Sequence, residues 1–199
     1  MQRVTVYCAS SAAAHPEFAA AAHRLGGILA RAGITTVYGG GAIGSMGRLA
    51  DGALEAGGRV VGIMPRFMGE LEWAHPKVTD IVWTTTMGER KERLFTDTDA
   101  LVALPGGTGT LEELVEVLTL KRLGQCFKPV VIVNQRGFYD PLIQLLGNCV
   151  AEAFMSPRHL DMWRVVDHVD EVLDGLRACP PWHPGDREFA VQRAPGTTP

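Results

Sequence analysis

The chain has 199 residues, of which 46% are hydrophobic and 21% are charged. This balance is typical of a folded, soluble protein of single-domain size and argues against an intrinsically disordered chain. The net charge of −3 gives no basic surface for a nucleic acid or for an anionic membrane, so we expect neither as a partner.

The cysteines and the N-terminus indicate a compartment. The four cysteines are too widely spaced for a zinc motif or a disulfide framework, so we expect no metal; they are Cys8, Cys126, Cys149 and Cys179. The first residues lack a long apolar segment, and no run approaches about 18 apolar residues. We therefore expect a cytoplasmic protein.

Strand and helix signals alternate along the chain. In order, the sequence predicts strand 4–8, helix 16–32, strand 34–38, helix 45–56, strand 59–64, a loop over 65–76, strand 79–84, helix 87–97, strand 100–104, helix 110–123, strand 129–133, helix 139–153, strand 164–166 and helix 170–178. Several strands are continuous apolar runs, which implies burial on both faces. Strands separated by helices imply right-handed crossovers and a doubly wound parallel sheet between two helix layers.

The domain organisation follows from the same pattern. Residues 1–179 are expected to form one α/β domain, with ligands collecting at the carboxyl ends of the strands. Residues 180–199 contain Pro, Gly, Arg and Thr without apolar periodicity. We expect this segment to be a disordered tail.

The most informative motif is Pro-Gly-Gly-Thr-Gly-Thr-Leu-Glu-Glu at residues 105–113, directly after the strand at 100–104. Glycines let backbone N–H groups approach a ligand, and a helix N-terminus favours an anion. No Gly-Lys-Ser/Thr ends the loop, so a triphosphate P-loop is not expected. A capping box explains Thr110 and Glu113, but it explains neither the three glycines nor Glu112. We interpret the motif as a phosphate site beside a catalytic carboxylate.

A second glycine loop, Gly-Gly-Gly-Ala-Ile-Gly, spans residues 39–44. It resembles a dinucleotide fingerprint, but it does not follow the first strand, and no acidic residue ends the next strand. An NAD site is therefore not expected. Two interpretations stay open for this loop: contact with a phosphate or ribose, and the packing of a tight turn.

The third element is the charged run Met-Gly-Glu-Arg-Lys-Glu-Arg at residues 87–93. Most of it is interpreted as a solvated helix face. Arg90 and Lys91 lie nearer the carboxyl end of a strand, where an arginine can hold and orient a carboxylate. On the following helix Glu112 and Thr119 share a face, whereas Glu113 is turned by about 100° from Glu112.

Together these motifs resemble the Lonely guy family. The matching patterns are Gly-Gly-Gly-x-x-Gly-x-Met-Gly at 39–47, Met-x-x-Arg-Lys at 87–91 and Pro-Gly-Gly-x-Gly-Thr-x-x-Glu at 105–113, and residues 6–11 also look like the family's first strand and loop. The resemblance spans residues 3–178. Members of the family are cytokinin riboside 5′-monophosphate phosphoribohydrolases, long labelled lysine decarboxylases.

The resemblance implies a Rossmann-like homodimer that cleaves the N-glycosidic bond of a purine nucleoside monophosphate without a cofactor. It implies catalytic roles for Arg90 and Glu113. The substrate contacts that we expect are Glu72, Met87, Arg90, Lys91, Gly106, Gly107, Thr108, Gly109, Thr110, Leu111, Glu112 and Thr119, with Ser10, Gly40, Gly41 and Gly44 as further contacts. The chain departs from the common pattern at Gly88, where histidine often stands, and at Ala9, where glycine is usual.

In the expected mechanism Glu113 stabilises the positive charge that grows on the ribose as the bond to the base breaks. Two alternatives are weighed against it. A pyridoxal phosphate decarboxylase needs a lysine in a cofactor site, and no lysine of the chain stands in such a context. A nucleotide or molybdenum-cofactor carrier would not require the Arg90 and Glu113 pair. The sequence leaves open whether the base is adenine or an N6-prenylated adenine.

Overall fold

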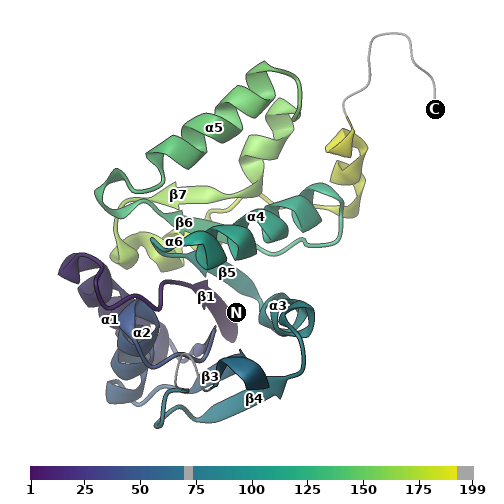
Figure 1. The fold of residues 1–199 in the computed structure, drawn as a ribbon. Helices are drawn as coiled ribbons and strands as arrows, with labels where there is room; N and C mark the ends of the chain where they lie inside the picture. The colour runs from purple at the N-terminus through teal and green to yellow at the C-terminus, as the bar shows by residue number, and fades with distance from the viewer. Residues whose placement is uncertain (70–73, 192–199) are drawn as a thin grey trace.

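The computed structural model describes residues 1–69 and 74–191 (Figure 1). Within this part of the chain, seven strands form one sheet in the order β4-β3-β2-β1-β5-β6-β7, and every neighbouring pair is parallel. The strands are β1 (Arg3–Tyr7), β2 (Thr35–Tyr38), β3 (Val60–Pro65), β4 (Asp80–Thr84), β5 (Ala100–Ala103), β6 (Val130–Val133) and β7 (Arg164–Val166). The predicted parallel sheet is confirmed.

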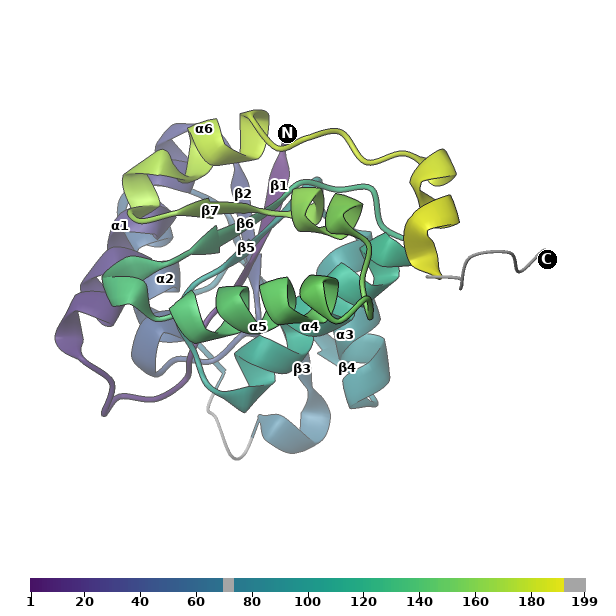
Figure 2. The same cartoon turned by 90° about the horizontal axis from the view of Figure 1, so that it is seen from above.

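Helices cover both faces of this sheet (Figure 2). The α-helices are α1 (Pro16–Arg31), α2 (Gly44–Glu55), α3 (Met87–Thr96), α4 (Thr108–Arg122), α5 (Asp140–Ala151) and α6 (Val172–Arg177). Short 3-10 helices are η1 (Arg66–Met68), η2 (Gln135–Gly137), η3 (Pro157–Met162), η4 (Val169–Glu171) and η5 (Pro184–Ala190). Helices α1, α2 and α6 pack on one face, and α3 and α4 pack on the other. This is the doubly wound, Rossmann-like architecture that the sequence predicts.

The two faces of each strand carry different parts of the core. In β1, Val4 and Val6 belong to the cluster beneath α1 and α2, whereas Tyr7 belongs to the cluster beneath α3 and α4. Successive side chains of a strand point to opposite faces, so a continuous apolar run supplies both clusters. The central strands are therefore buried on both sides.

Helices α1 and α2 meet backbone to backbone. A Cβ atom on Gly26 would lie 2.1 Å from the carbonyl oxygen of Leu49, and one on Gly52 would lie 1.9 Å from that of His23. Only glycine fits at such separations. This close packing fixes α2 against α1, and the N–H of Met46 donates to the carbonyl of Ala9 at 3.0 Å, which ties the start of α2 to the segment after β1.

The strand order reverses between β1 and β5, which are neighbours in the sheet. After β1 the chain turns toward α1 on one face, and after β5 it turns toward α4 on the other. The two connections diverge and leave a crevice at the carboxyl edge, where ligands bind in this class of fold.

The segment from residue 180 differs from the expected disordered tail. Trp182 is only 3% exposed, and its indole N–H donates to the carbonyl of Lys121 at 2.8 Å. The guanidinium of Arg158 lies 5.3 Å from the Trp182 ring centre, and η5 follows. One large aromatic side chain can anchor a segment, but alone it produces no apolar period in the sequence. Residues 192–199 lie outside the described residues.

Among the described residues, the structure has no helix that is both long and apolar enough to cross a membrane.

Candidate active site

A cavity of about 290 Å³ lies at the switch point between β1 and β5. Its lining is formed by Cys8, Ala9, Ser10, Ser11, Met46, Met68, Met87, Arg90, Gly107, Thr108, Gly109, Thr110 and Glu113. These residues follow β1 and β5 or come from η1, from the first turns of α2 and α3, and from the first two turns of α4. The cavity therefore occupies the position that the fold predicts for a ligand.

One end of the cavity is the N-terminus of α4. The N-cap residue is Gly107, which has no side chain with which to cap the helix. Cβ atoms on Gly107 and Gly109 would meet nothing within 4 Å, so the backbone there is open. The first-turn N–H groups and the helix dipole make this end suitable for a phosphate.

The capping-box interpretation of Thr110 and Glu113 is wrong. Gly107, not Thr110, occupies the N-cap, and helix α4 begins at Thr108, two residues earlier than predicted. Thr110 instead packs its side chain on Gly106, where a Cβ atom would lie 2.2 Å from Oγ1 of Thr110. The Glu113 carboxylate is thus not used at the helix start.

Glu113 pairs with Arg90 in the wall of the cavity. Nη1 of Arg90 donates to Oε1 of Glu113 at 2.7 Å, and Nε donates to the carbonyl of Ile63 at 3.3 Å. The Arg90 and Glu113 side chains are 5% and 6% exposed. Burial raises the pKa of Glu113 above its ordinary value, against the lowering effect of Arg90. The site therefore holds a carboxylate in a largely dry environment, fixed by a guanidinium.

Thr86 explains why Arg90 points inward. It is the N-cap of α3, and its Oγ1 accepts from the N–H of Glu89 at 3.1 Å. This cap starts the helix at Met87, so Met87 and Arg90 lie one turn apart on the face toward the cavity. The structure thus places both residues in the wall of the cavity.

Lys91 and Glu112 lie beside the cavity but outside its lining. Nζ of Lys91 donates to Oε1 of Glu112 at 2.5 Å and lies 3.1 Å from Oε1 of Glu116. The hydrogen bond to Glu112 raises the pKa of Lys91. These two expected contacts bind each other at the surface.

Thr119 is farther away. Its hydroxyl donates to the carbonyl of Val115 at 2.9 Å, one turn back along α4. It lines a separate groove of about 160 Å³ between α4 and α5, together with apolar side chains that include Leu146 and Met155. A single chain therefore does not bring Thr119 to the cavity.

The loop at residues 39–44 supports the cavity from outside. A Cβ atom on Gly44 would lie 2.6 Å from the carbonyl oxygen of Ser11, and the carbonyl of Gly40 accepts from the N–H of His75 at 3.0 Å. Gly41 forms an isolated bridge with Ala74. In the described part of the chain, Gly40, Gly41 and Gly44 are absent from the lining, and the packing interpretation accounts for them.

The expected site residues divide accordingly. Those in the cavity lining are Ser10, Met87, Arg90, Gly107, Thr108, Gly109, Thr110 and Glu113. Of the described residues, those outside the lining are Gly40, Gly41, Gly44, Lys91, Gly106, Leu111, Glu112 and Thr119. Glu72 lies outside the described residues.

Sequence reasoning missed several lining residues. Cys8, Ala9 and Ser11 follow β1, and Met46 and Met68 come from α2 and η1. The sequence shows that Cys8, Ala9 and Ser11 follow a buried strand. That they line the cavity depends on β1 lying next to β5, which the sequence does not show. Cys8 is 1% exposed, and burial raises the pKa of its thiol, so it stays protonated as expected of a core residue.

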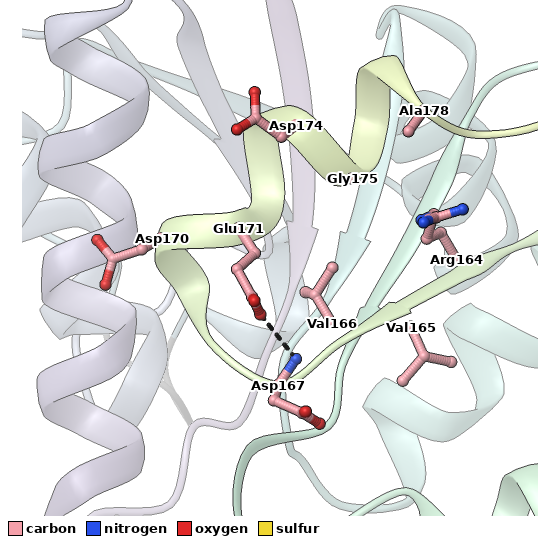
Figure 3. Close-up of a pocket in the computed structure, with 9 residues that line it drawn as sticks. All are labelled: Arg164, Val165, Val166, Asp167, Asp170, Glu171, Asp174, Gly175 and Ala178. Atoms are coloured by element: carbon pink, nitrogen blue, oxygen red, sulfur yellow. Dashed lines mark hydrogen bonds between the residues drawn. The ribbon is translucent and has the colours of Figure 1, made fainter.

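A larger hollow, of about 480 Å³, lies between β7 and α6 (Figure 3). Two of its carboxylates have structural partners. Glu171 accepts from the N–H groups of Asp167 and His168, both at 3.0 Å, and Asp170 pairs with Arg24 of α1. Within the described residues no group of three or more His, Cys, Asp or Glu is arranged to hold a metal.

Comparisons with known proteins agree with the motifs. A family model described as "Possible lysine decarboxylase" matches residues 46–176. A "Probable cytokinin riboside 5′-monophosphate phosphoribohydrolase" of Oryza sativa subsp. japonica is 40% identical over 154 residues, which cover 77% of this chain and 69% of the relative. The Mycobacterium tuberculosis "Cytokinin riboside 5′-monophosphate phosphoribohydrolase" is 38% identical over 178 residues, which cover 89% and 93%.

Solved structures show the same fold. The molybdenum cofactor carrier protein of Chlamydomonas reinhardtii superposes with a TM-score of 0.69 at 22% identity, over 88% of this chain and 96% of that one. A molybdenum cofactor binding protein of Rippkaea orientalis gives a TM-score of 0.68 at 21% identity, over 89% and 96%. At such low identity the similarity concerns the fold alone.

Proposed function

Because the chain belongs to the Lonely guy family of cytokinin riboside 5′-monophosphate phosphoribohydrolases, we propose that it hydrolyses the N-glycosidic bond of a purine nucleoside 5′-monophosphate. The products are the free base and ribose 5-phosphate. The substrate class comprises AMP and its N6-prenylated, cytokinin-type analogues. One observation carries the proposal: the buried Arg90–Glu113 pair lies beside the open N-terminus of α4.

The 5′-phosphate binds the first turn of α4. Backbone N–H groups of residues 107–110 and the helix dipole favour its charge. Glu113 lies about one and a half turns further along the same helix, in the same cavity. Binding the phosphate therefore fixes the ribose next to the carboxylate, and the binding energy of a remote group is used for alignment.

The reaction breaks the bond between the anomeric carbon and the base nitrogen. Positive charge grows on the ribose, and the Glu113 carboxylate stabilises it more strongly than it stabilises the neutral ground state. Water adds its oxygen to the anomeric carbon and gives one proton to Glu113, which passes it to the departing base, so that OH ends on the sugar and H on the base. Arg90 keeps the carboxylate oriented through the 2.7 Å hydrogen bond. The low exposure of both side chains strengthens these electrostatic effects.

The two alternatives are less well supported. A pyridoxal phosphate enzyme needs a lysine at the reacting centre; the lining contains none among the described residues, and Lys91 is paired with Glu112. A carrier protein needs no buried Arg–Glu pair to hold its cargo. The structures of the molybdenum cofactor proteins share only the fold with this chain.

Homodimer formation is part of the proposal. Helix α5 is strongly apolar yet has no buried residue, and Leu145 and Phe154 are 57% and 74% exposed. Val115 of α4 is also exposed, and it lines the apolar groove that holds Thr119 together with Leu146 and Met155, the sequence neighbours of Leu145 and Phe154. A second copy of the chain would cover this face. The substrate contact implied for Thr119 would then come from the partner subunit.

We expect Leu145→Asp to convert a dimer into a monomer, since a buried, unpaired charge is costly at an apolar interface. Sedimentation analysis of the wild type and the variant measures this. Phe67→Asp is the matched control, because Phe67 is 55% exposed and lies at the β3–β4 end of the sheet. A monomeric wild type contradicts the proposed dimer.

Three broader expectations also remain proposals. The four cysteines are free in the structure, which fits a reducing, cytoplasmic location. Residues 1–179 are proposed to form a single domain around two core clusters that share one sheet. The net charge of −3 supports a small-molecule partner and favours neither a nucleic acid nor a membrane.

The test of the function is direct. The full chain is incubated with AMP, with N6-isopentenyl-AMP and with adenosine, and free base and ribose 5-phosphate are quantified by chromatography. We expect equal amounts of base and sugar phosphate from the nucleotides and very little cleavage of adenosine, which lacks the phosphate. Binding of both nucleotides without release of base contradicts the proposal and favours a carrier.

A further inference from the structure

We propose that Gly39 is a positioning residue for Arg90: the missing side chain at position 39 leaves the space in which the guanidinium reaches Glu113. This inference rests on the proposed function, because it concerns the same ion pair. Gly39 follows β2 directly and is absent from the cavity lining among the described residues. It therefore acts through Arg90.

The geometry at Gly39 is restrictive. A Cβ atom there would lie 2.5 Å from Nη2 of Arg90, 2.9 Å from Cε of Met46 and 3.2 Å from Sδ of Met46. Real Cβ contacts below 3.0 Å essentially never occur. Gly39 has no positive φ, unlike Gly40 and Gly44. The backbone conformation at Gly39 is therefore compatible with alanine. Only the contacts of the added methyl group with Arg90 and Met46 oppose the substitution.

The guanidinium has little freedom to yield while keeping its contacts. Nε donates to the Ile63 carbonyl of β3, Nη1 donates to Glu113 of α4, and Nη2 lies against Gly39. The group is planar and rigid, so displacing one nitrogen moves the other two. A methyl group at position 39 therefore shifts Nη1 away from its 2.7 Å contact with Glu113.

Other tightly packed glycines would respond differently. At Gly26 and Gly52 an added Cβ would meet backbone oxygens at 2.1 Å and 1.9 Å, so the helices themselves would have to separate. At Gly39 it would meet the ends of two side chains, which can move without disturbing the fold. Substitution at Gly39 should therefore disturb the geometry of the site with little change in the stability of the fold. Substitution at Gly52 should lower the stability of the fold.

The first experiment compares Gly39→Ala with the wild type. A misplacement of about 1 Å in a catalytic group can cost about 100-fold in rate, so we expect kcat to fall about 10-fold to 100-fold with Tm almost unchanged. Gly185→Ala is the matched control, because an added Cβ there meets nothing within 4 Å. Unchanged kcat in Gly39→Ala overturns the inference.

A double-mutant cycle separates positioning from other effects. If Gly39 acts through Arg90, Gly39→Ala has no further effect on kcat in an Arg90→Ala background. In a Met46→Ala background the effect of Gly39→Ala persists, since the contact with Nη2 remains. The assignment is contradicted if Gly39→Ala lowers kcat further in the Arg90→Ala background. It is also contradicted if Gly39→Ala no longer lowers kcat in the Met46→Ala background.

A third measurement does not depend on activity. Arg90 lowers the pKa of Glu113, so Gly39→Ala should raise it, as Arg90→Ala should. Titration of carbon-13-labelled glutamate side chains by NMR measures this, with Glu113→Gln identifying the signal. If the wild type proves inactive on nucleotides, this titration still tests Gly39. An unchanged pKa of Glu113 in Gly39→Ala overturns the positioning role.

Discussion

Lys91 and Arg90 of α3 pair with the neighbouring residues Glu112 and Glu113 of α4, and Lys91 also reaches Glu116. Arg90 pairs with Glu113 inside the cavity wall, where the two side chains are 5% and 6% exposed. Lys91 pairs with Glu112 at the surface, where they are 19% and 54% exposed. The sequence assigns all four residues to the site, with Glu113 as catalytic, Lys91 and Glu112 as substrate contacts and Arg90 as both, but the structure separates a buried pair from an exposed one.

The difference comes from the rotation of about 100° between consecutive residues of a helix. Because one pair is buried and the other exposed, the two pairs also differ in their contribution to stability. Breaking a buried pair by removing one partner leaves an uncompensated charge and typically costs about 3–5 kcal/mol. An exposed pair contributes about 0–1 kcal/mol. The same two helices thus carry one interaction that defines the site and one that mainly joins their surfaces.

The largest effect is expected from breaking the buried pair. Glu113→Ala and Arg90→Ala should each lower turnover by at least about 100-fold, because each removes a positioned catalytic group. Product release from AMP measures this, and circular dichroism checks the fold. Because a lone buried charge can unfold the protein, Glu113→Gln and Arg90→Lys serve as conservative second variants. Near-normal turnover in folded Glu113→Ala contradicts the assigned role.

The pH dependence sharpens the same comparison. The proposed role needs the carboxylate form of Glu113, whose pKa is raised by burial. Activity should therefore fall with decreasing pH through that raised pKa, at a higher pH than for an ordinary glutamate. The linked stability has the opposite sign, since the folded state holds this proton more tightly and stability falls as pH rises through the same window.

Removing the guanidinium tests the cause of this behaviour. The acid limb of kcat should move to higher pH in Arg90→Lys if that variant loses the 2.7 Å contact, because the lowering effect of Arg90 on the pKa of Glu113 is weakened. Rate profiles of wild type and variant, measured from pH 4 to pH 9, give the shift. A limb that stays at the wild-type position indicates that another group titrates.

The smallest effect is expected from the exposed pair. Lys91→Met should change the free energy of unfolding by about 1 kcal/mol or less and lower kcat/KM by less than about 10-fold. Urea unfolding and product assays measure the two quantities, and Glu112→Gln should behave similarly. If Lys91→Met matches Arg90→Ala in its loss of turnover, Lys91 takes part in the chemistry and the contrast between the pairs is wrong.

The sequence alone determined the elements and the fold class. The last strand was predicted at residues 164–166 and is found at Arg164–Val166, and helix 16–32 is found at Pro16–Arg31. These features depend on local signals: the apolar period, the glycines and prolines that end elements, and the continuous apolar runs of buried strands. The glycine motif at 105–113 likewise predicted a helix start after a buried strand, and the structure places Gly107 at the N-cap of α4 in the cavity lining.

Only the tertiary structure decided which side chains share the cavity. It brought residues 8–11, Met46 and Met68 to the site, and it kept Lys91 and Thr119 away from it. It also placed Trp182 against α4 where the sequence indicated a disordered tail. These outcomes depend on the order of the strands and on the rotation of each helix about its axis, which contacts between residues distant in the sequence determine.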